Sequence, residues 1–381
     1  MKEIFDFFNP VDTEFVNQFQ SEEKLQFVQQ AGIYTEQKIP ENINDVKIAF
    51  FDIDSRGKLG DPVRKFLYKL YLPNENIGIL DMGNLKDGNT PADKLAALKE
   101  VFIILLEKQV VPVCLSPDSG FLYHIYKVFE CLETPLSVVS VNSTIELDKE
   151  LNDATDETPF LSRIIMDRSK FLFNYTNLGF QSYLVSQNDT RLLDRLLFDA
   201  IRLGQVNANP KEVEPVMRDA DIVYMSINSI RQSEAPARLQ ASANGLYGDQ
   251  ACMISRYAGI SDKVQLFVLD GFDPDFDINF HTANLLSEII WYFIEGYSQR
   301  RNDYPYAKLS DYKKFVVQVS DASDPIVFYK SNKSDRWWMR VESRSGEKKR
   351  NLIVACSYED YQKACNQEIP NKWLKMYQKI S

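Results

Sequence analysis

Alternate polar side chains follow an apolar run in the segment Ser140-Val141-Asn142-Ser143-Thr144-Ile145-Glu146-Leu147. Side chains alternate along a strand, so Asn142, Thr144 and Glu146 share one side of an extended chain. This spacing is typical of a strand end that binds divalent metal ions through carboxylates and imidazoles. Asn142 and Thr144 offer only a neutral amide and a hydroxyl. The segment therefore has the frame of a metal site without most of its ligands.

Two further strand ends carry polar groups that belong to the same kind of site. The apolar run 110–115 leads into Ser116-Pro117-Asp118-Ser119-Gly120, where Asp118 offers a carboxylate and Ser119 a hydroxyl. The run 222–227 contains Ser226 and is followed by Asn228, and both side chains are neutral. Sites in open parallel sheets form at the carboxyl ends of strands, so we expect these groups to meet at one edge of a sheet.

Apolar runs typical of buried strands alternate with helical patterns through most of the chain. We expect strands at Asp45–Asp52, Ile77–Asp81, Val110–Leu115, Ser137–Val141, Phe180–Val185, Ile222–Ile227 and Val264–Leu269. We expect helices at Val63–Leu70, Pro91–Gln109, Gly120–Leu132, Thr190–Leu203, Gly248–Ala258 and Thr282–Tyr297. This alternation predicts an α/β fold with α-β-α layers around a doubly wound, mainly parallel sheet.

The sequence after about Arg300 has a different character. It is rich in Lys, Tyr, Ser and Asp, and short strand-like pieces at Lys314–Val319 and Pro325–Tyr329 replace the alternation. A helix is expected near Asn371–Ile380. We therefore divide the chain into an N-terminal extension (1–44), an α/β domain (45–300) and a C-terminal appendage that packs on the domain (301–381).

Composition excludes several classes of function. The net charge of −10 argues against non-specific binding to nucleic acid or to anionic membranes, which requires basic surfaces. No apolar run is long enough to cross a membrane, and the first residues lack the apolar stretch of a signal peptide. The five cysteines are widely spaced without a CxxC pair, which favours reduced thiols in the cytoplasm.

Several segments resemble the ureohydrolase superfamily of arginases, agmatinases and formimidoylglutamases, and the formimidoylglutamase-like branch is most similar. The resemblance covers roughly Ile48–Tyr297. The segments that carry it, besides the strand ends, are Gly57…Gly60…Arg64, Asp81-Met82-Gly83-Asn84, Arg231-Gln232-Ser233-Glu234-Ala235-Pro236 and Asn244-Gly245-Leu246-Tyr247-Gly248. The resemblance implies an arginase-like fold.

The resemblance also implies a pair of manganese ions bridged by hydroxide. The positions of their ligands correspond to Ser119, Asn142, Thr144, Glu146, Ser226 and Asn228, and a rival register moves the last pair to Asn228 and Ile230. A glutamate that faces the substrate in the family corresponds to Gly271, and the neighbouring Asp270 is expected to point to the opposite side of its strand. Only Glu146 keeps an ionisable group, so we expect no catalytic residue, no metal and no other cofactor.

Two functions follow from this reading. The first is a catalytically inactive ureohydrolase-like protein, a pseudoenzyme that acts by protein binding or assembly. The alternative is a metal-dependent hydrolase of guanidino or formimidoyl compounds, that is, of linear amidines, with an altered metal site. A sensor that keeps a vestigial substrate pocket at Asp118, Glu146, Glu234 and Gly271 for a small metabolite stays open.

A non-catalytic domain must act through its surface. Aromatic residues and arginine are enriched at binding hot spots, and the appendage contains Arg336, Trp337, Trp338 and Trp373. We therefore expect this region to supply a surface for a protein partner or a second copy of the chain, although aromatic side chains of this kind also serve to pack an appendage onto its domain.

Overall fold

The computed structural model describes most of the chain. The described residues are 2–40, 45–74, 77–132, 135–148, 158–167, 170–238, 241–305, 309–319, 324–345 and 348–381. Residue 44, at which the predicted N-terminal extension ends, lies outside the described residues.

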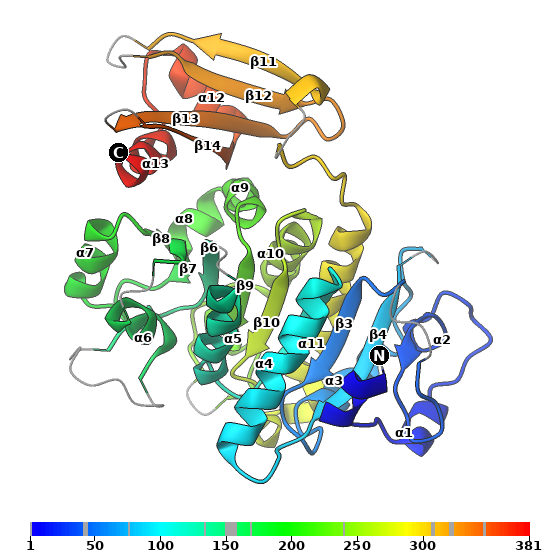
Figure 1. Ribbon diagram of the computed structural model, residues 1–381. Coiled ribbons are helices and arrows are strands. Elements are labelled where there is room, and N and C mark those ends of the chain that lie inside the picture. The colour runs from blue at the N-terminus through cyan, green and yellow to red at the C-terminus, as the bar shows by residue number, and fades with distance from the viewer. Residues whose placement is uncertain are drawn as a thin grey trace.

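A ten-stranded sheet forms the centre of the larger part of the molecule (Figure 1). Its strands lie in the order β1 (Phe8–Asn9), β4 (Ile79–Leu85), β3 (Ile48–Asp52), β5 (Val111–Ser116), β10 (Leu266–Asp270), β9 (Ile222–Ser226), β6 (Leu136–Val141), β7 (Leu172–Phe180) and β8 (Asp199–Arg202), and β2 (Gly32–Ile33) pairs with β4. The pairs between these strands are parallel, except that β1 runs antiparallel to β4. The predicted mainly parallel sheet is confirmed.

Helices cover both faces of this sheet, so its central strands are buried on both sides. One face packs against α3 (Gly60–Leu67), α8 (Leu203–Ala208), α9 (Val213–Arg218), α10 (Gly248–Ile260) and α11 (His281–Ser298). The other packs against α4 (Pro91–Glu107), α5 (Gly120–Cys131), α6 (Phe160–Met166) and α7 (Gln187–Arg195). The short helices α1 (Thr13–Asn17) and α2 (Phe27–Gln30) precede β2, and 3-10 turns occupy Lys2–Phe7, Pro210–Glu212, Ile227–Ser229, Pro274–Phe276, Ile278–Phe280 and Leu309–Asp311.

The expected start of α4 is confirmed in detail. The Thr90 hydroxyl accepts a hydrogen bond from the backbone N–H of Asp93, and the Asp93 carboxylate accepts one from the Thr90 N–H. Pro91 occupies the first helical turn, where its missing N–H costs nothing.

The region between β7 and α8 corrects two predictions. The strand expected at Phe180–Val185 lies earlier, as β7, because polar Asn174 and Thr176 interrupt the apolar run that would have indicated it. The helix expected at Thr190–Leu203 ends at Arg195, after which Leu197 adopts a positive φ of 57°. The chain then adds the edge strand β8 before α8 begins.

The C-terminal part contains a second, antiparallel sheet. Its strands are β11 (Tyr312–Val317), β12 (Ile326–Ser331), β13 (Trp337–Ser345) and β14 (Lys348–Cys356), followed by α12 (Tyr358–Cys365) and α13 (Asn371–Ile380). Met339, Val341 and Met376 contribute to a core between this sheet and the two helices. The sequence indicated parts of β11 and β12 and all of α13, but not β13, β14 or α12.

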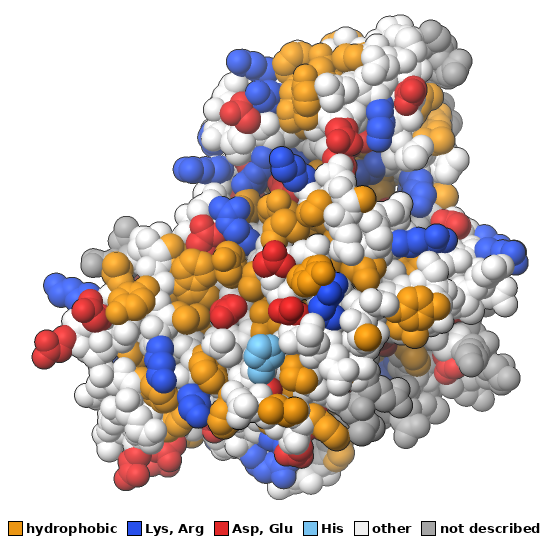
Figure 2. Space-filling model, turned by 180° about the vertical axis from the view of Figure 1, so that it is seen from behind, with side chains coloured by type: hydrophobic (Ala, Val, Ile, Leu, Met, Phe, Trp, Pro, Cys, Tyr) orange, Lys and Arg blue, Asp and Glu red, His pale blue; other side chains and the backbone are white. Residues whose placement is uncertain are grey.

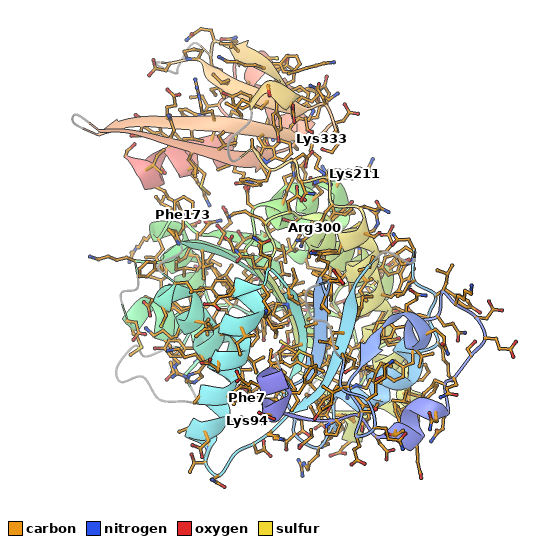
Figure 3. All side chains as sticks on the ribbon, turned by 45° about the vertical axis from the view of Figure 1, so that its right-hand side comes forward. Phe7, Lys94, Phe173, Lys211, Arg300 and Lys333 are labelled. Carbon is orange, nitrogen blue, oxygen red and sulfur yellow. The ribbon has the colours of Figure 1, made fainter. Side chains whose placement is uncertain are left out.

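Arg218, at the end of α9, is central to the joint between the two parts. Its guanidinium donates to the carbonyls of Trp337 (2.8 Å) and Cys356 (3.0 Å). It also lies over the Trp338 ring, 4.5 Å from the centroid. Figure 3 shows Phe173 at the same boundary, where α13 approaches the start of β7.

No helix among the described residues is long and apolar enough to cross a membrane. On the face seen in Figure 2, basic and acidic side chains are interspersed and form no single basic patch.

Candidate functional site

The strand ends that carry the predicted site residues lie side by side. Asp270 at the end of β10 is in register with Ser116 of β5 on one side and with Ser226 of β9 on the other. Val141 at the end of β6 is in register with Met225 of β9. The parallel sheet therefore brings the segments after β5, β6 and β9 to one edge, as expected.

Glu146 lies at this edge, and both of its carboxylate oxygens have partners. The Asn142 amide donates to Oε1 at 2.8 Å, and the Ser119 hydroxyl donates to Oε2 at 3.2 Å. Burial raises the pKa of Glu146, although both hydrogen bonds favour the ionised form. Asn177 of β7 donates to the Thr144 carbonyl at 2.8 Å and so fixes the loop. Four predicted ligand positions thus bond to one another or to the strand beside them.

The last two predicted ligand positions lie next to an arginine. Asn228 accepts a hydrogen bond from the Arg238 guanidinium at 3.1 Å. The same guanidinium donates to the carbonyls of Ile227 and, at 2.7 Å, Ile230. Burial lowers the pKa of Arg238 to about 10, which leaves it charged at neutral pH. Ser226 is buried, and its hydroxyl accepts from the Asn228 N–H at 3.3 Å.

Asp270 is a further buried acid at this edge. Burial raises its pKa to about 7, and the negative charge of Glu146 adds to this effect, although the Tyr224 and Ser226 hydroxyls favour ionisation. Its Oδ1 atom has no hydrogen-bond partner in the described part of the chain. Asp270 is therefore close enough to the site for the charges of Glu146 and Asp118 to raise its pKa.

The backbone at Gly271 disfavours the glutamate that the family resemblance places there. Its φ is +79°, a backbone conformation that strains any residue with a Cβ atom. A Cβ atom at this position would lie 3.3 Å from the Ser226 hydroxyl, a tight contact, and 3.5 Å from Ile227. A side chain here would therefore be strained.

The other two residues assigned to the vestigial pocket have local partners. Asp118 is exposed, and its carboxylate accepts a hydrogen bond from the Gly120 N–H at 2.7 Å, at the start of α5. Glu234, in the loop after β9, has its Oε2 atom 3.1 Å from the point where Gly248 would carry a Cβ atom. The structure therefore places the Glu234 carboxylate against the start of helix α10.

These residues do not fit a pair of manganese ions. Two divalent cations need several anionic ligands, and removing them from water without such ligands costs several kcal/mol or more. Within the described ranges, no group of three or more His, Cys, Asp or Glu side chains is arranged to hold a metal ion. Glu146 is already hydrogen-bonded to neutral groups, and the Arg238 cation beside Asn228 repels a second cation.

The aromatic residues assigned to a partner surface mostly lie inside the appendage. Trp338 is fully buried and Trp337 is 9% exposed. The Trp373 indole donates to the Arg340 carbonyl at 3.0 Å, and Arg336 lies 3.6 Å from Asp303 in an ion pair. The two adjacent tryptophans are thus core residues, and the partner surface stays a prediction.

Sequence reasoning missed Arg238 and Asn177. Arg238 lies two residues beyond the matched segment 231–236, and no motif marks it. Asn177 lies in β7, which was expected at 180–185. Residues two apart on a strand share a face, so a correctly placed strand would have put Asn177 on the same face as Tyr175.

No family model matches the sequence, and no curated protein matches it. Solved structures do match the fold. A formiminoglutamase from Trypanosoma cruzi with Mn²⁺ matches with a TM-score of 0.61 and 14% identity, over 68% of this chain and 96% of that one. The formimidoylglutamase of Bacillus subtilis matches with a TM-score of 0.60 and 15% identity, over 72% and 92%. The agmatine ureohydrolase of Thermoplasma volcanium matches with 0.55 and 17%, over 68% and 92%. The chain therefore has the fold of these enzymes.

Proposed function

We propose that this chain is a catalytically inactive protein of the ureohydrolase fold, which acts by binding or assembly. The observation that carries the proposal is the pairing at the strand ends. Glu146, the one ionisable ligand position, is bonded to Ser119 and Asn142, and Asn228 is bonded to Arg238. The geometry of Gly271 supports the proposal, because its positive φ would strain a glutamate at this position.

Metal content and hydrolysis together test the proposal. After incubation with excess MnCl₂ and dialysis, we expect well under one manganese ion per chain and no hydrolysis of formiminoglutamate, agmatine or arginine. Two retained ions, or turnover that depends on the protein and is lost with a chelator, would establish the alternative, an altered metal-dependent hydrolase.

A rebuilt chain provides the matched control. Restoring anionic and imidazole ligands should raise manganese content above that of the natural sequence, because the fold already places these positions at one edge. The substitutions are Ser119→His, Asn142→Asp, Thr144→His, Glu146→Asp, Ser226→Asp and Asn228→Asp. A rebuilt chain that still binds no metal shows that the assay or the register of the positions, rather than ligand loss, explains the result.

Binding is the second half of the proposal. We propose a protein partner or a second copy of the chain, with a small metabolite at the strand-end edge as a further ligand. Light scattering after size exclusion measures the mass, and a thermal-shift series with arginine, agmatine and formiminoglutamate tests the metabolite. No shift at millimolar concentrations argues against the metabolite.

We also propose a reducing, cytoplasmic location. All five cysteines are free thiols in the structure, and Cys131 and Cys365 are exposed. Exposed free thiols persist in reducing compartments. Fractionation or imaging of the tagged protein in its own cells tests this assignment.

A further inference from the structure

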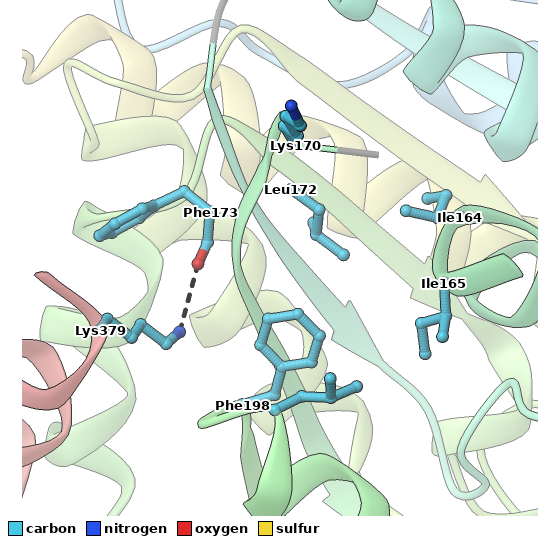
Figure 4. A pocket seen from close by; sticks show the side chains of 8 residues that line it. Ile164, Ile165, Lys170, Leu172, Phe173, Phe198 and Lys379 are labelled. Atoms are coloured by element: carbon cyan, nitrogen blue, oxygen red, sulfur yellow. Dashed lines mark hydrogen bonds between the residues drawn. The ribbon is translucent and has the colours of Figure 1, made fainter. Parts of the chain in front are cut away.

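A cavity of about 380 Å³ lies where α13 meets the α/β domain, away from the strand-end site. Its apolar lining consists of Ile164, Ile165, Leu172, Phe173, Leu196 and Phe198, and its polar lining of Lys170 and Lys379. In Figure 4, Lys379 enters from one side, whereas Ile164 and Ile165 of α6 lie on the other. The volume is in the range of small-molecule sites. The lining is thus apolar and cationic, without an acidic residue.

Lys379 is a desolvated cation with neutral partners. Its ammonium donates to the Phe173 carbonyl at 3.3 Å and to the Asn174 side-chain oxygen. The ring centroids of Phe198 and Phe173 lie 5.0 Å and 5.6 Å away. Burial lowers the pKa of Lys379 to about 8, and the charge of Asp199 opposes this shift only in part. An ammonium group has three N–H donors, so these two bonds leave one for a ligand.

Two neighbouring lysines on the same helix show what Lys379 lacks. Lys372 pairs with Asp219 at 2.7 Å, and Lys375 pairs with Asp199 at 2.7 Å. Both therefore have a carboxylate from the α/β domain as counter-charge. The acid that acts on Lys379, Asp199, is already held by Lys375. An anion in the cavity would give Lys379 the counter-charge that its neighbours have.

We propose that this cavity binds a small monocarboxylate with an apolar body, its carboxylate on the Lys379 ammonium and its body against Ile164, Ile165 and Phe198. A single charge suits the site, because the half-buried Lys379 ammonium has one N–H left for a ligand, whereas Lys170 is exposed to water. Each methylene group that leaves water contributes about 0.8 kcal/mol. The ligand would touch both the appendage and the α/β domain. The proposal is independent of the fate of the metal site.

The test measures binding of sodium octanoate to the full chain by calorimetry, with 1-octanol as the uncharged ligand of equal length. We expect one octanoate per chain, binding at least tenfold more tightly than octanol, and an affinity that falls as pH rises above 8. Lys379→Gln should weaken octanoate binding at least tenfold. Lys372→Gln is the matched control, because Lys372 pairs with Asp219 and does not line this cavity, and it should bind as the natural chain does.

A second variant protects the test against a misfolded Lys379→Gln protein. Ile165→Trp fills the apolar end of the cavity without changing a charge, and it should weaken octanoate binding while circular dichroism stays unchanged. The proposal is overturned if octanol binds as tightly as octanoate, if both variants bind like the natural chain, or if no binding is detected at about 5 mM octanoate.

Discussion

At the scale of single residues, the polar side chains at the strand ends bond to one another and to Arg238. Arg238 supplies a fixed positive charge beside Asn228, and Glu146 receives two neutral donors. Buried polar groups are costly when they lose their partners, so the arrangement is self-sufficient only while each partner is present.

Replacing Arg238 by methionine should destabilise the protein strongly. The substitution leaves the carbonyls of Ile227 and Ile230 and the Asn228 side chain without their donor. Loss of a buried charged partner costs about 3 kcal/mol or more. Urea unfolding measures the loss. Arg191→Met, at an exposed position of α7, is the control and should change stability by less than about 0.5 kcal/mol. Equal effects of the two substitutions would contradict the structural role of Arg238.

Because of Asp270, the free energy of unfolding should depend on pH between about 4 and 7. Its folded-state pKa of about 7 lies above the unfolded value of about 3.9, so the folded state binds the proton more tightly. The contribution of Asp270 to the free energy of unfolding is then greatest below about pH 4. It falls as the pH rises towards 7, by up to about 1.4 kcal/mol per pH unit.

Asp270→Asn should remove that dependence. The variant should be about 2 to 4 kcal/mol more stable than the natural chain at pH 8, and the difference should vanish near pH 4. Denaturant titrations at both pH values check it, with Asp194→Asn on the exposed side of α7 as control. A stabilisation that is the same at both pH values would disprove the titration argument.

The neutral ligand positions could be read from the sequence because they follow recognisable strands. Ser119, Asn142 and Thr144 were expected at one edge, and the register of the sheet places their segments there. Arg238 could not be read, because its contact depends on how the loop after β9 folds back. Nothing local in the sequence specifies that path.

At the scale of elements, α13 contacts the α/β domain through one face and the core of the appendage through another. Lys372, Lys375 and Lys379 bond to the α/β domain, whereas Met376 and Ile380 pack in the core of the appendage. The members of each set are three or four residues apart, which places them on one face of a helix. The sequence predicted this helix, and only the structure shows that its lysines form the face that contacts the α/β domain.

Arg218→Ala should loosen the appendage. The guanidinium at the end of α9 bonds two carbonyls of the antiparallel sheet, and its removal leaves them buried and unpaired. We expect a loss of about 2 to 4 kcal/mol and faster cleavage by trypsin after Arg300 or Arg301. Arg195→Ala, on the exposed end of α7, should leave the cleavage rate unchanged. Unaltered cleavage of the Arg218 variant would show that this contact does not hold the two parts together.

Helices and strands with a clear capping motif or a continuous apolar run were predicted better than those without one. Helix α4 begins with a threonine cap and proline, and both the cap and the helix are found. Strand β8 is short and lies at the sheet edge, so it lacks the apolar run of a central strand. Strands β13 and β14 are pairs in an antiparallel sheet, where alternating polar residues weaken the apolar signal.

At the scale of the whole molecule, the two parts are joined by bonds from several elements. Asp219 accepts hydrogen bonds from the Ala355 N–H, at 2.9 Å and 3.1 Å, and from Lys372 at 2.7 Å. Together with Arg218 and Lys375, it connects the end of β14 and helix α13 to the α/β domain. The sequence predicted an appendage that packs on the domain, but the partners across this joint are far apart in the chain and could not be paired in advance.

Calorimetry should therefore show one cooperative transition for the natural chain, with equal calorimetric and van't Hoff enthalpies. Asp219→Ala removes acceptors for both Ala355 and Lys372, and it should separate the transition into two or lower the enthalpy ratio below one. Asp194→Ala serves as the control. Two separate transitions in the natural chain would mean that the joint contributes little to stability.

The arginine beside Asn228 has a consequence for the history of the protein. A single nucleotide change can restore aspartate at position 228, but the new carboxylate would form an ion pair with the guanidinium that already lies 3.1 Å from the Asn228 oxygen. Selection would then preserve the pair for its stability and not for catalysis. A carboxylate that is paired with a guanidinium is a weaker ligand for a cation, so Arg238 opposes the gain of a metal ligand at position 228.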